Sequence, residues 1–123
     1  MIEMINSARN KMKYICFLEK NTELPMMLID DAVQSAYQLM SVKKSSLSVK
    51  GSYNITSFSI SPKVLKKQIL LNDFKIDVEF KPDFRQQIAN SWPKKINDIK
   101  AKSDWGWKAK YNMEEAIRLS LKF

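Results

Sequence analysis

The chain contains no histidine, one cysteine and only two glycines among its 123 residues. With these few residues it can build neither a histidine-based catalytic triad nor a zinc site with the usual cysteine and histidine ligands. Gly51 and Gly106 lie too far apart for a glycine-rich phosphate loop. No tyrosine is followed four residues later by a lysine, the pair that transfers a proton in many reductases. We therefore predict no catalytic residue, no cofactor-binding residue and no metal ligand in this chain.

The single cysteine excludes an internal disulfide bond. Cys16 lies in the apolar run 14–18, where we expect a small buried thiol, and this cysteine usage is typical of a reducing compartment. No stretch approaches the ~20 apolar residues that span a bilayer. Residues 1–13 lack the continuous apolar core of a signal peptide. The expectation is a cytoplasmic protein without membrane contact.

The charge balance is basic, with 21 lysines and arginines against 13 acidic residues, a net charge of +8. Between residues 92 and 110, lysines alternate with tryptophans, an arrangement that can bind single-stranded nucleic acid. However, arginine is sparse, and Asp98 and Asp104 interrupt the basic stretch. A solvated lysine-rich surface is the simpler interpretation, and a nucleic-acid-binding module remains the alternative.

Hydrophobic periodicity predicts a single small mixed α/β domain over residues 1–123, with about four helices and three or four short strands. The predicted helices cover residues 2–12, about 31–42, 63–71, 97–102 and the stretch that follows Asn112. Extended segments are predicted at 14–18, 24–29, 51–55 and 75–80. Ser61 followed by Pro62 is typical of a helix start. Asn112 with Glu115 resembles a capping box.

All three tryptophans lie within residues 92–107. Trp105 and Trp107 flank Gly106 between two predicted helices, where large rings usually pack against one end of a domain. Trp92 belongs to a polar segment, Asn90-Ser91-Trp92-Pro93, which we interpret as a loop. Loops often carry functional side chains, so packing and pocket roles both stay open for Trp92.

Several blocks, taken in order, resemble the C-terminal half of short-chain-type L-threonine 3-dehydrogenases. These enzymes are extended short-chain dehydrogenases/reductases of the NAD-dependent epimerase/dehydratase family. The resemblance covers nearly the whole chain, and the order and spacing of the blocks make it specific. The blocks are residues 14–18, 24–27 with 30–32, 52–55, 58–62, 82–86, 88–93 and 104–107.

The resemblance implies a fold and a division of labour. Residues 1–123 would form a small mixed α+β substrate-binding lobe without the Rossmann domain, and residues 1–12 would be a lead-in helix. In the family, NAD and the catalytic serine, tyrosine and lysine belong to that other domain. The chain alone is therefore expected to bind no cofactor and to be inactive, with a separate Rossmann half or self-association as its partner. A decayed remnant without activity is a further alternative.

The resemblance also implies a binding site for an amino-acid substrate. The segment carrying Asn90, Ser91 and Trp92 is expected to face the substrate. The family pattern has an aspartate where Asn90 stands and a basic residue where Glu23 stands. A lost carboxylate and a reversed charge would alter the electrostatics of a pocket for a zwitterion.

Overall fold

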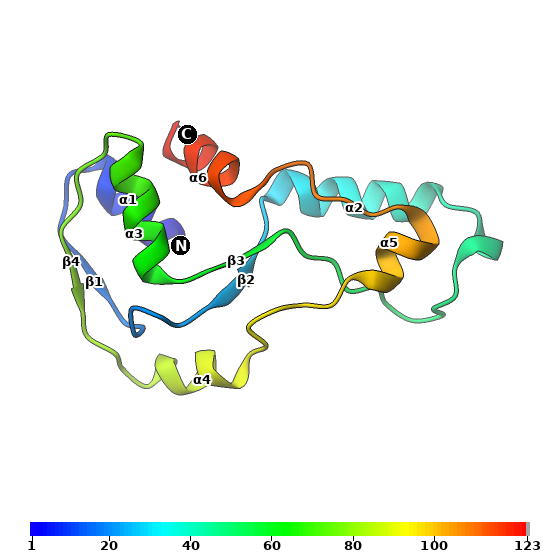
Figure 1. Ribbon diagram of the computed structural model, residues 1–123, viewed down its shortest axis with the longest axis horizontal. Helices are drawn as coiled ribbons and strands as arrows, with labels where there is room; N and C mark the ends of the chain where they lie inside the picture. The colour runs from blue at the N-terminus through cyan, green and yellow to red at the C-terminus, as the bar shows by residue number, and fades with distance from the viewer. Residues whose placement is uncertain (123) are drawn as a thin grey trace.

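The structure is a computed structural model that describes residues 1–122. Within them the chain forms α-helices, a 3-10 helix and three-residue strands (Figure 1). The helices are α1 (Ile2–Arg9), α2 (Ile29–Ser41), the 3-10 helix η1 (Lys44–Ser46), α3 (Pro62–Leu71), α4 (Arg85–Ser91), α5 (Ile99–Trp105) and α6 (Met113–Lys122). The strands are β1 (Tyr14–Cys16), β2 (Leu24–Met26), β3 (Phe58–Ile60) and β4 (Val78–Phe80).

The strands form two separate pairs. β1 pairs in parallel with β4, with Tyr14 opposite Val78, and β2 pairs antiparallel with β3, with Leu24 opposite Ile60. Glu79 of β4 reinforces the first pair through ion pairs with Lys13 (2.7 Å) and Lys81 (2.8 Å). The hydrogen bond from Lys13, followed by that from Lys81, lowers the pKa of Glu79 to about 2. The carboxylate therefore stays ionised well into the acid range.

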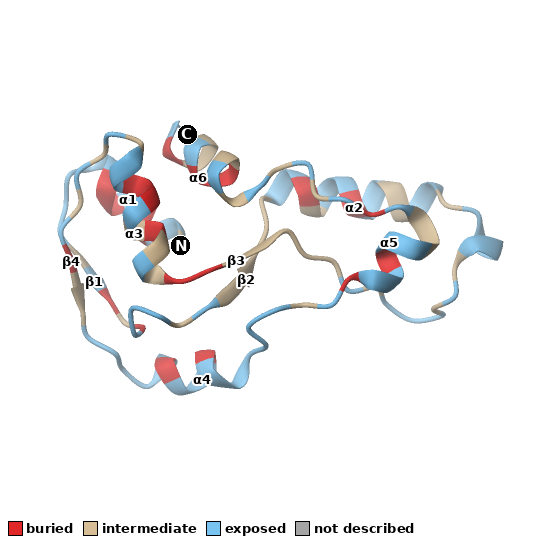
Figure 2. Ribbon diagram, in the orientation of Figure 1, coloured by how far each residue is buried: buried red, intermediate tan, exposed pale blue. Residues whose placement is uncertain are grey.

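The hydrophobic core lies where α1, α3 and α6 pack together beside the strands, and Figure 2 shows their buried faces in red. Its buried members are Met4, Ile5, Ala8, Cys16, Leu18, Ile60, Leu65, Ile69, Val78, Ala89, Ile117 and Leu121. Full burial of a large aliphatic side chain stabilises the fold by about 1.5–3 kcal/mol. The prediction of a buried thiol at Cys16 is confirmed.

Two predicted helix starts are confirmed by their capping hydrogen bonds. The hydroxyl oxygen of Ser61 accepts from the backbone N–H of Val64 (3.4 Å), and Pro62 is the first residue of α3. Before α6, the backbone N–H of Asn112 donates to Glu115 (3.0 Å), and that of Glu115 donates to Asn112 Oδ1 (2.9 Å). Such caps satisfy N–H groups that have no partner within the helix, so local sequence is enough to place them.

The predicted strand at 51–55 is wrong, because this segment has no pairing partner within residues 1–122. Side chains hold the segment instead. The Tyr53 hydroxyl donates to Asp104 Oδ2 (2.6 Å), which also accepts from the backbone N–H of Ser48 (2.9 Å). The Ser48 hydroxyl also donates to Asp104 Oδ2 (2.6 Å). This bond and the one from Tyr53 are the main reasons why the pKa of Asp104 lies far below its usual range. A segment with a strand-like sequence forms a β-ladder only where a neighbouring strand supplies hydrogen-bond partners.

The helix count and several boundaries also need correction. Residues 1–122 contain six α-helices rather than about four, and α4 was not predicted at all. The lead-in helix ends at Arg9 rather than residue 12, since Lys11 has a left-handed backbone (φ 54°). The segment 75–80 pairs only at β4, and the helix predicted at 97–102 is α5. Seven-residue helices such as α4 are too short to show a clear hydrophobic period.

α2 forms as predicted, but its apolar stripe faces away from the core. Ile29, Val33, Tyr37 and Met40 are 71%, 63%, 67% and 85% exposed. The helix is held at its start by Asp31, which is 1% exposed and accepts from the backbone N–H groups of Lys110 (2.8 Å) and Tyr111 (3.3 Å). A 13-residue helix with an uncovered hydrophobic stripe is unusual in a complete domain.

The predicted packing of the tryptophan turn is confirmed. Gly106 ends α5 with a left-handed backbone (φ 68°), which glycine adopts without strain. Trp107 is 2% exposed and donates its indole N–H to the carbonyl oxygen of Thr56 (3.3 Å). Trp105 contacts it with ring centroids 5.7 Å apart and meets Tyr53 edge-on at 5.9 Å. The three rings join α5 to the segment that precedes β3.

We expect Trp107→Ala to cost roughly 3–5 kcal/mol of unfolding free energy, because Trp107 is the least exposed aromatic side chain among residues 1–122. Such a loss would remove most of the stability of a small domain at the low end of the usual range. Trp92→Ala is the control, since Trp92 is 57% exposed, and it should cost less than about 1.5 kcal/mol. Urea melts of the two variants measure the difference. A larger loss for Trp92→Ala would contradict the packing role assigned to Trp107.

Candidate functional site

A hollow of about 350 Å³ lies between the β1–β2 connection and the end of α4. The connection contributes Glu19, Asn21, Thr22 and Glu23, and the other side is formed by Ala89, Asn90, Trp92 and Lys94. Its size is suited to a small molecule such as an amino acid. The hollow thus joins two segments that are about 70 residues apart along the chain.

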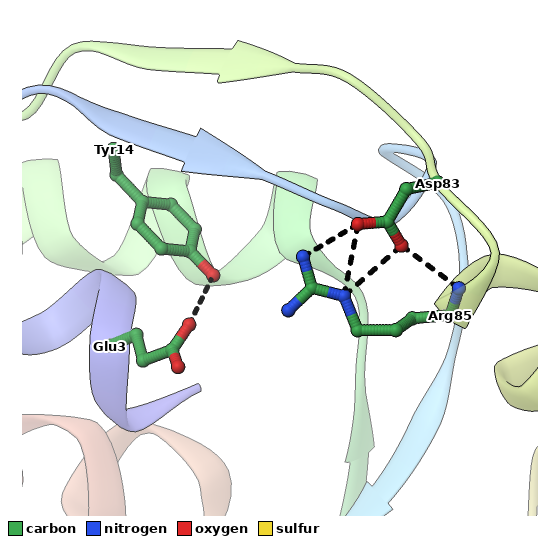
Figure 3. Close-up of polar contacts among 4 residues, drawn as sticks. All are labelled: Glu3, Tyr14, Asp83 and Arg85. Carbon is green, nitrogen blue, oxygen red and sulfur yellow. Dashed lines mark hydrogen bonds and ion pairs between the residues drawn. The ribbon is translucent and has the colours of Figure 1, made fainter.

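The first turn of α4 is anchored by an arginine. Arg85 forms a two-pronged ion pair with Asp83, with Nη2 2.7 Å from Oδ2 and Nε 3.1 Å from Oδ1 (Figure 3). Asp83 Oδ1 also accepts from the backbone N–H of Arg85 (2.9 Å), which starts the helix. The guanidinium carbon lies 3.5 Å from the centroid of the Phe17 ring, a cation–π contact to the segment after β1. The stack and the ion pair therefore orient α4 toward β1.

Below the hollow, Gln86 connects α4 to the β1–β2 connection. This side chain is buried, and its Oε1 accepts from the backbone N–H of Glu19 (2.8 Å) and from the Thr22 hydroxyl (3.2 Å). Its Nε2 donates to Thr22 Oγ1 (2.9 Å) and to Asn90 Oδ1 (2.7 Å). The floor of the hollow is thus a closed hydrogen-bond network. Sequence reasoning missed Gln86, although its spacing from Asn90, four residues within α4, places both on one helix face.

The structure separates the three predicted site residues. Asn90 and Trp92 line the hollow, whereas Ser91 does not. The Ser91 hydroxyl donates to the carbonyl oxygen of Ile88 (2.7 Å), a bond within the last turn of α4. The expectation of a loop is wrong for Asn90 and Ser91, which belong to α4, and Trp92 is its C-cap. The buried residues of this helix are Gln86 and Ala89.

The hollow carries both signs of charge. Glu19 and Glu23 approach it from the β1–β2 connection, and Lys94 from the segment after α4. Glu23 and Asn90, the two positions where the resemblance led us to expect a basic residue and an aspartate, therefore line the same hollow. A zwitterion would find opposite charges here for its two ends.

Glu19, Glu23 and Lys94 are the ionisable side chains that line the hollow, and all three are exposed. Among residues 1–122, no cluster of histidine, cysteine, aspartate and glutamate side chains is arranged to hold a metal ion. Tyr14 donates to Glu3 (3.3 Å), away from the hollow, and burial raises the pKa of Tyr14 to about 12 (Figure 3). Burial likewise raises the pKa of the Cys16 thiol.

A wider hollow of about 960 Å³ lies between the ends of α1 and α3 and the segment before β4. Its charged lining residues, Arg9, Lys11, Lys13, Asp73, Lys75 and Asp77, are all exposed. No buried polar side chain is directed into it. The charges of the smaller hollow are exposed as well, but two of its lining residues, Thr22 and Asn90, accept hydrogen bonds from the buried Gln86, which makes it the better candidate.

Thr22→Val should cost about 1–2 kcal/mol of unfolding free energy, because valine keeps the shape of threonine but leaves Gln86 short of hydrogen bonds. The control is Thr56→Val, since the Thr56 hydroxyl forms no hydrogen bond within residues 1–122. Urea unfolding of both variants measures the effect. Equal losses would contradict a structural role for the network.

Comparison with known proteins gives relatives over the whole chain, although no family model matches it. The mitochondrial L-threonine 3-dehydrogenase of Bos taurus is 33% identical over 99% of this chain, which is 33% of that protein. An uncharacterised epimerase/dehydratase of Staphylococcus aureus is 32% identical over 98% of this chain and 38% of its own length. The chain spans about a third of the length of the curated relatives it matches.

Solved structures agree with the sequence relatives. The holo form of the GalE-like L-threonine dehydrogenase from Cupriavidus necator matches with a TM-score of 0.94 and 36% identity, over 98% of this chain and 39% of that chain. L-threonine 3-dehydrogenase from Trypanosoma brucei matches with a TM-score of 0.92 and 34% identity, over 98% and 38%. In sequence and in fold, the chain is homologous to the C-terminal part of L-threonine 3-dehydrogenases and related epimerase/dehydratases, the extended short-chain dehydrogenases/reductases.

Proposed function

We propose that this chain acts as the substrate-binding lobe of an NAD-dependent L-threonine 3-dehydrogenase-like enzyme. The observation that carries the proposal is the hollow lined by Asn90 and Trp92 in a chain whose fold follows L-threonine dehydrogenases along almost its entire length. The substrate class is an amino-acid zwitterion. The chemistry of hydride transfer belongs to residues outside residues 1–122.

The charges around the hollow support one orientation of the bound substrate. Lys94 and the amide of Asn90 suit the carboxylate end, and Glu19 and Glu23 suit the ammonium end. Trp92 offers an apolar wall for the short side chain. This lobe therefore binds and orients the substrate, which converts a loose encounter into a defined geometry.

The residues of this chain do not fit a dinucleotide. Gly106 ends α5 in a left-handed turn, and Gly51 lies in the exposed stretch after η1. Neither opens a helix directly after a strand, which is the arrangement that holds a pyrophosphate. We assign NAD to the remaining part of the enzyme and place no step of its chemistry on this lobe.

The apolar stripe of α2 supports a partner for this lobe. Ile29, Val33, Tyr37 and Met40 lie along one helix face with no cover in residues 1–122. The extended segment 51–55 next to α5 has no strand partner there either. We assign both features to contact with the nucleotide-binding part, since the matched relatives are longer than this chain. Without that part, the stripe favours self-association.

Nucleic-acid binding is not favoured by the tryptophan arrangement. Trp107 is enclosed and Trp105 packs against it, so neither ring is free to stack on a base. Lys102 is paired with Asp98 (2.8 Å) rather than presented to phosphate. Within residues 1–122, no helix is both long and apolar enough to cross a membrane.

A chimera tests the proposed function. The corresponding lobe of the Cupriavidus necator dehydrogenase is replaced by this chain, and NADH formation from L-threonine is measured. We expect turnover, and we expect Trp92→Ala to lower kcat/KM about tenfold or more by removing a wall of the hollow. Ser91→Ala, the matched control in the same turn, should stay within about twofold. A folded chimera that binds NAD but forms no NADH would favour a decayed remnant.

Glutamate substitutions test whether the apolar stripe of α2 is a docking surface. Val33→Glu combined with Met40→Glu should abolish binding of the 123-residue chain to a separately produced nucleotide-binding part, and should reduce self-association. Gln34→Glu with Ser41→Glu adds the same charge at the same spacing beside the stripe and should leave binding within about twofold. Sedimentation velocity measures both. Equal effects of the two pairs would contradict docking through the apolar stripe.

A further inference from the structure

In the hydrogen-bond network around Gln86, a backbone N–H group determines which side-chain atoms donate and which accept. The backbone N–H of Glu19 only donates, so the Gln86 atom 2.8 Å from it must be the carbonyl oxygen Oε1. The other end of the Gln86 amide is then the nitrogen, which only donates. This fixed starting point determines the polarity of each group that follows.

The orientation of the Gln86 amide in turn determines the orientation of the Asn90 amide. Gln86 Nε2 lies 2.7 Å from the Asn90 side chain, so Asn90 must offer its oxygen at that point. The amide nitrogen of Asn90 is then turned away from Gln86, and it donates to no group within residues 1–122. Because Asn90 lines the hollow, this N–H₂ group is the one that a ligand meets.

We propose that Gln86 is a positioning residue that holds the N–H₂ group of Asn90 toward the hollow, so that this wall selects a hydrogen-bond acceptor of the ligand, such as a carboxylate. The inference deepens the proposed function and rests on it for the identity of the ligand. An aspartate at position 90 would accept from Gln86 in the same way, but its second oxygen would face the hollow as an acceptor. Asparagine at this position therefore reverses the preference of the wall from cations to anions.

The orientation is measured by NMR on the ¹⁵N-labelled 123-residue chain at pH 8, with acetate and methylammonium as probes for each end of a zwitterion. In the unmodified chain we expect slow solvent exchange of the Gln86 amide protons and fast exchange of those of Asn90. Acetate should shift the Asn90 amide signals, and methylammonium should not. Protected Asn90 protons, or a response to methylammonium alone, would overturn the proposal.

Gln86→Glu tests whether the Gln86 amide determines the orientation of the Asn90 side chain. The new carboxylate still accepts from the backbone N–H of Glu19, but it has no N–H to donate, so Asn90 turns its N–H₂ group inward. The Asn90 protons should become protected and acetate binding should weaken about tenfold. Gln87→Glu, on the exposed neighbour, adds the same charge and should change neither. An unchanged Asn90 signal in Gln86→Glu would refute the positioning role.

Asn90→Asp provides a second variant at an exposed position, where folding is not at risk. Gln86 should keep its protected amide protons, acetate binding should weaken about tenfold, and methylammonium should now shift neighbouring signals. Unaltered acetate binding would overturn the selection of an acceptor. Activity of the chimera without any acetate response would separate the two ideas, because it would uphold the proposed function while refuting this inference.

Discussion

The architecture depends on hydrogen bonds from distant backbone N–H groups to three polar side chains. Gln86 accepts from Glu19, Asp31 accepts from Lys110 and Tyr111, and Asp104 accepts from Ser48. The strands within residues 1–122 are only three residues long, so their ladders supply few bonds between segments. Gln86 and Asp31 are buried, and a buried group that loses its partner costs about 1–3 kcal/mol, so these two acceptors determine the paths of the segments they bind.

The described residues form two regions, a hydrophobic core and an extension from it. The core of α1, α3 and α6 supplies most of the buried apolar surface, at one end of the molecule in Figure 2. α2 and α5 extend from it, held by Asp31 and by the tryptophan turn, and they expose apolar side chains. This distribution fits the proposed contact with another part of a longer protein, since the relatives are longer than this chain.

The candidate site depends on how α4 is placed against the β1–β2 connection. Arg85 directs α4 toward β1 through Asp83 and Phe17, and Gln86 then fixes the distance to the β1–β2 connection. Asn90 and Trp92 reach the hollow as a consequence of that placement. The chemistry of the site therefore depends on buried polar bonds below it as much as on the side chains that line it.

Local features were predictable from the sequence because they depend on neighbours a few residues apart. The Ser61 cap, the Asn112–Glu115 capping box, the Gly106 turn and the helix at α2 are of this kind. The resemblance in the 82–93 segment also directed attention to Asn90 and Trp92. Tertiary structure alone decided that 51–55 remains unpaired, that the α2 stripe is exposed, and that Gln86 meets Glu19 and Thr22. These outcomes depend on partners 50 or more residues away, or outside the chain, and no local period encodes which distant donor meets which acceptor.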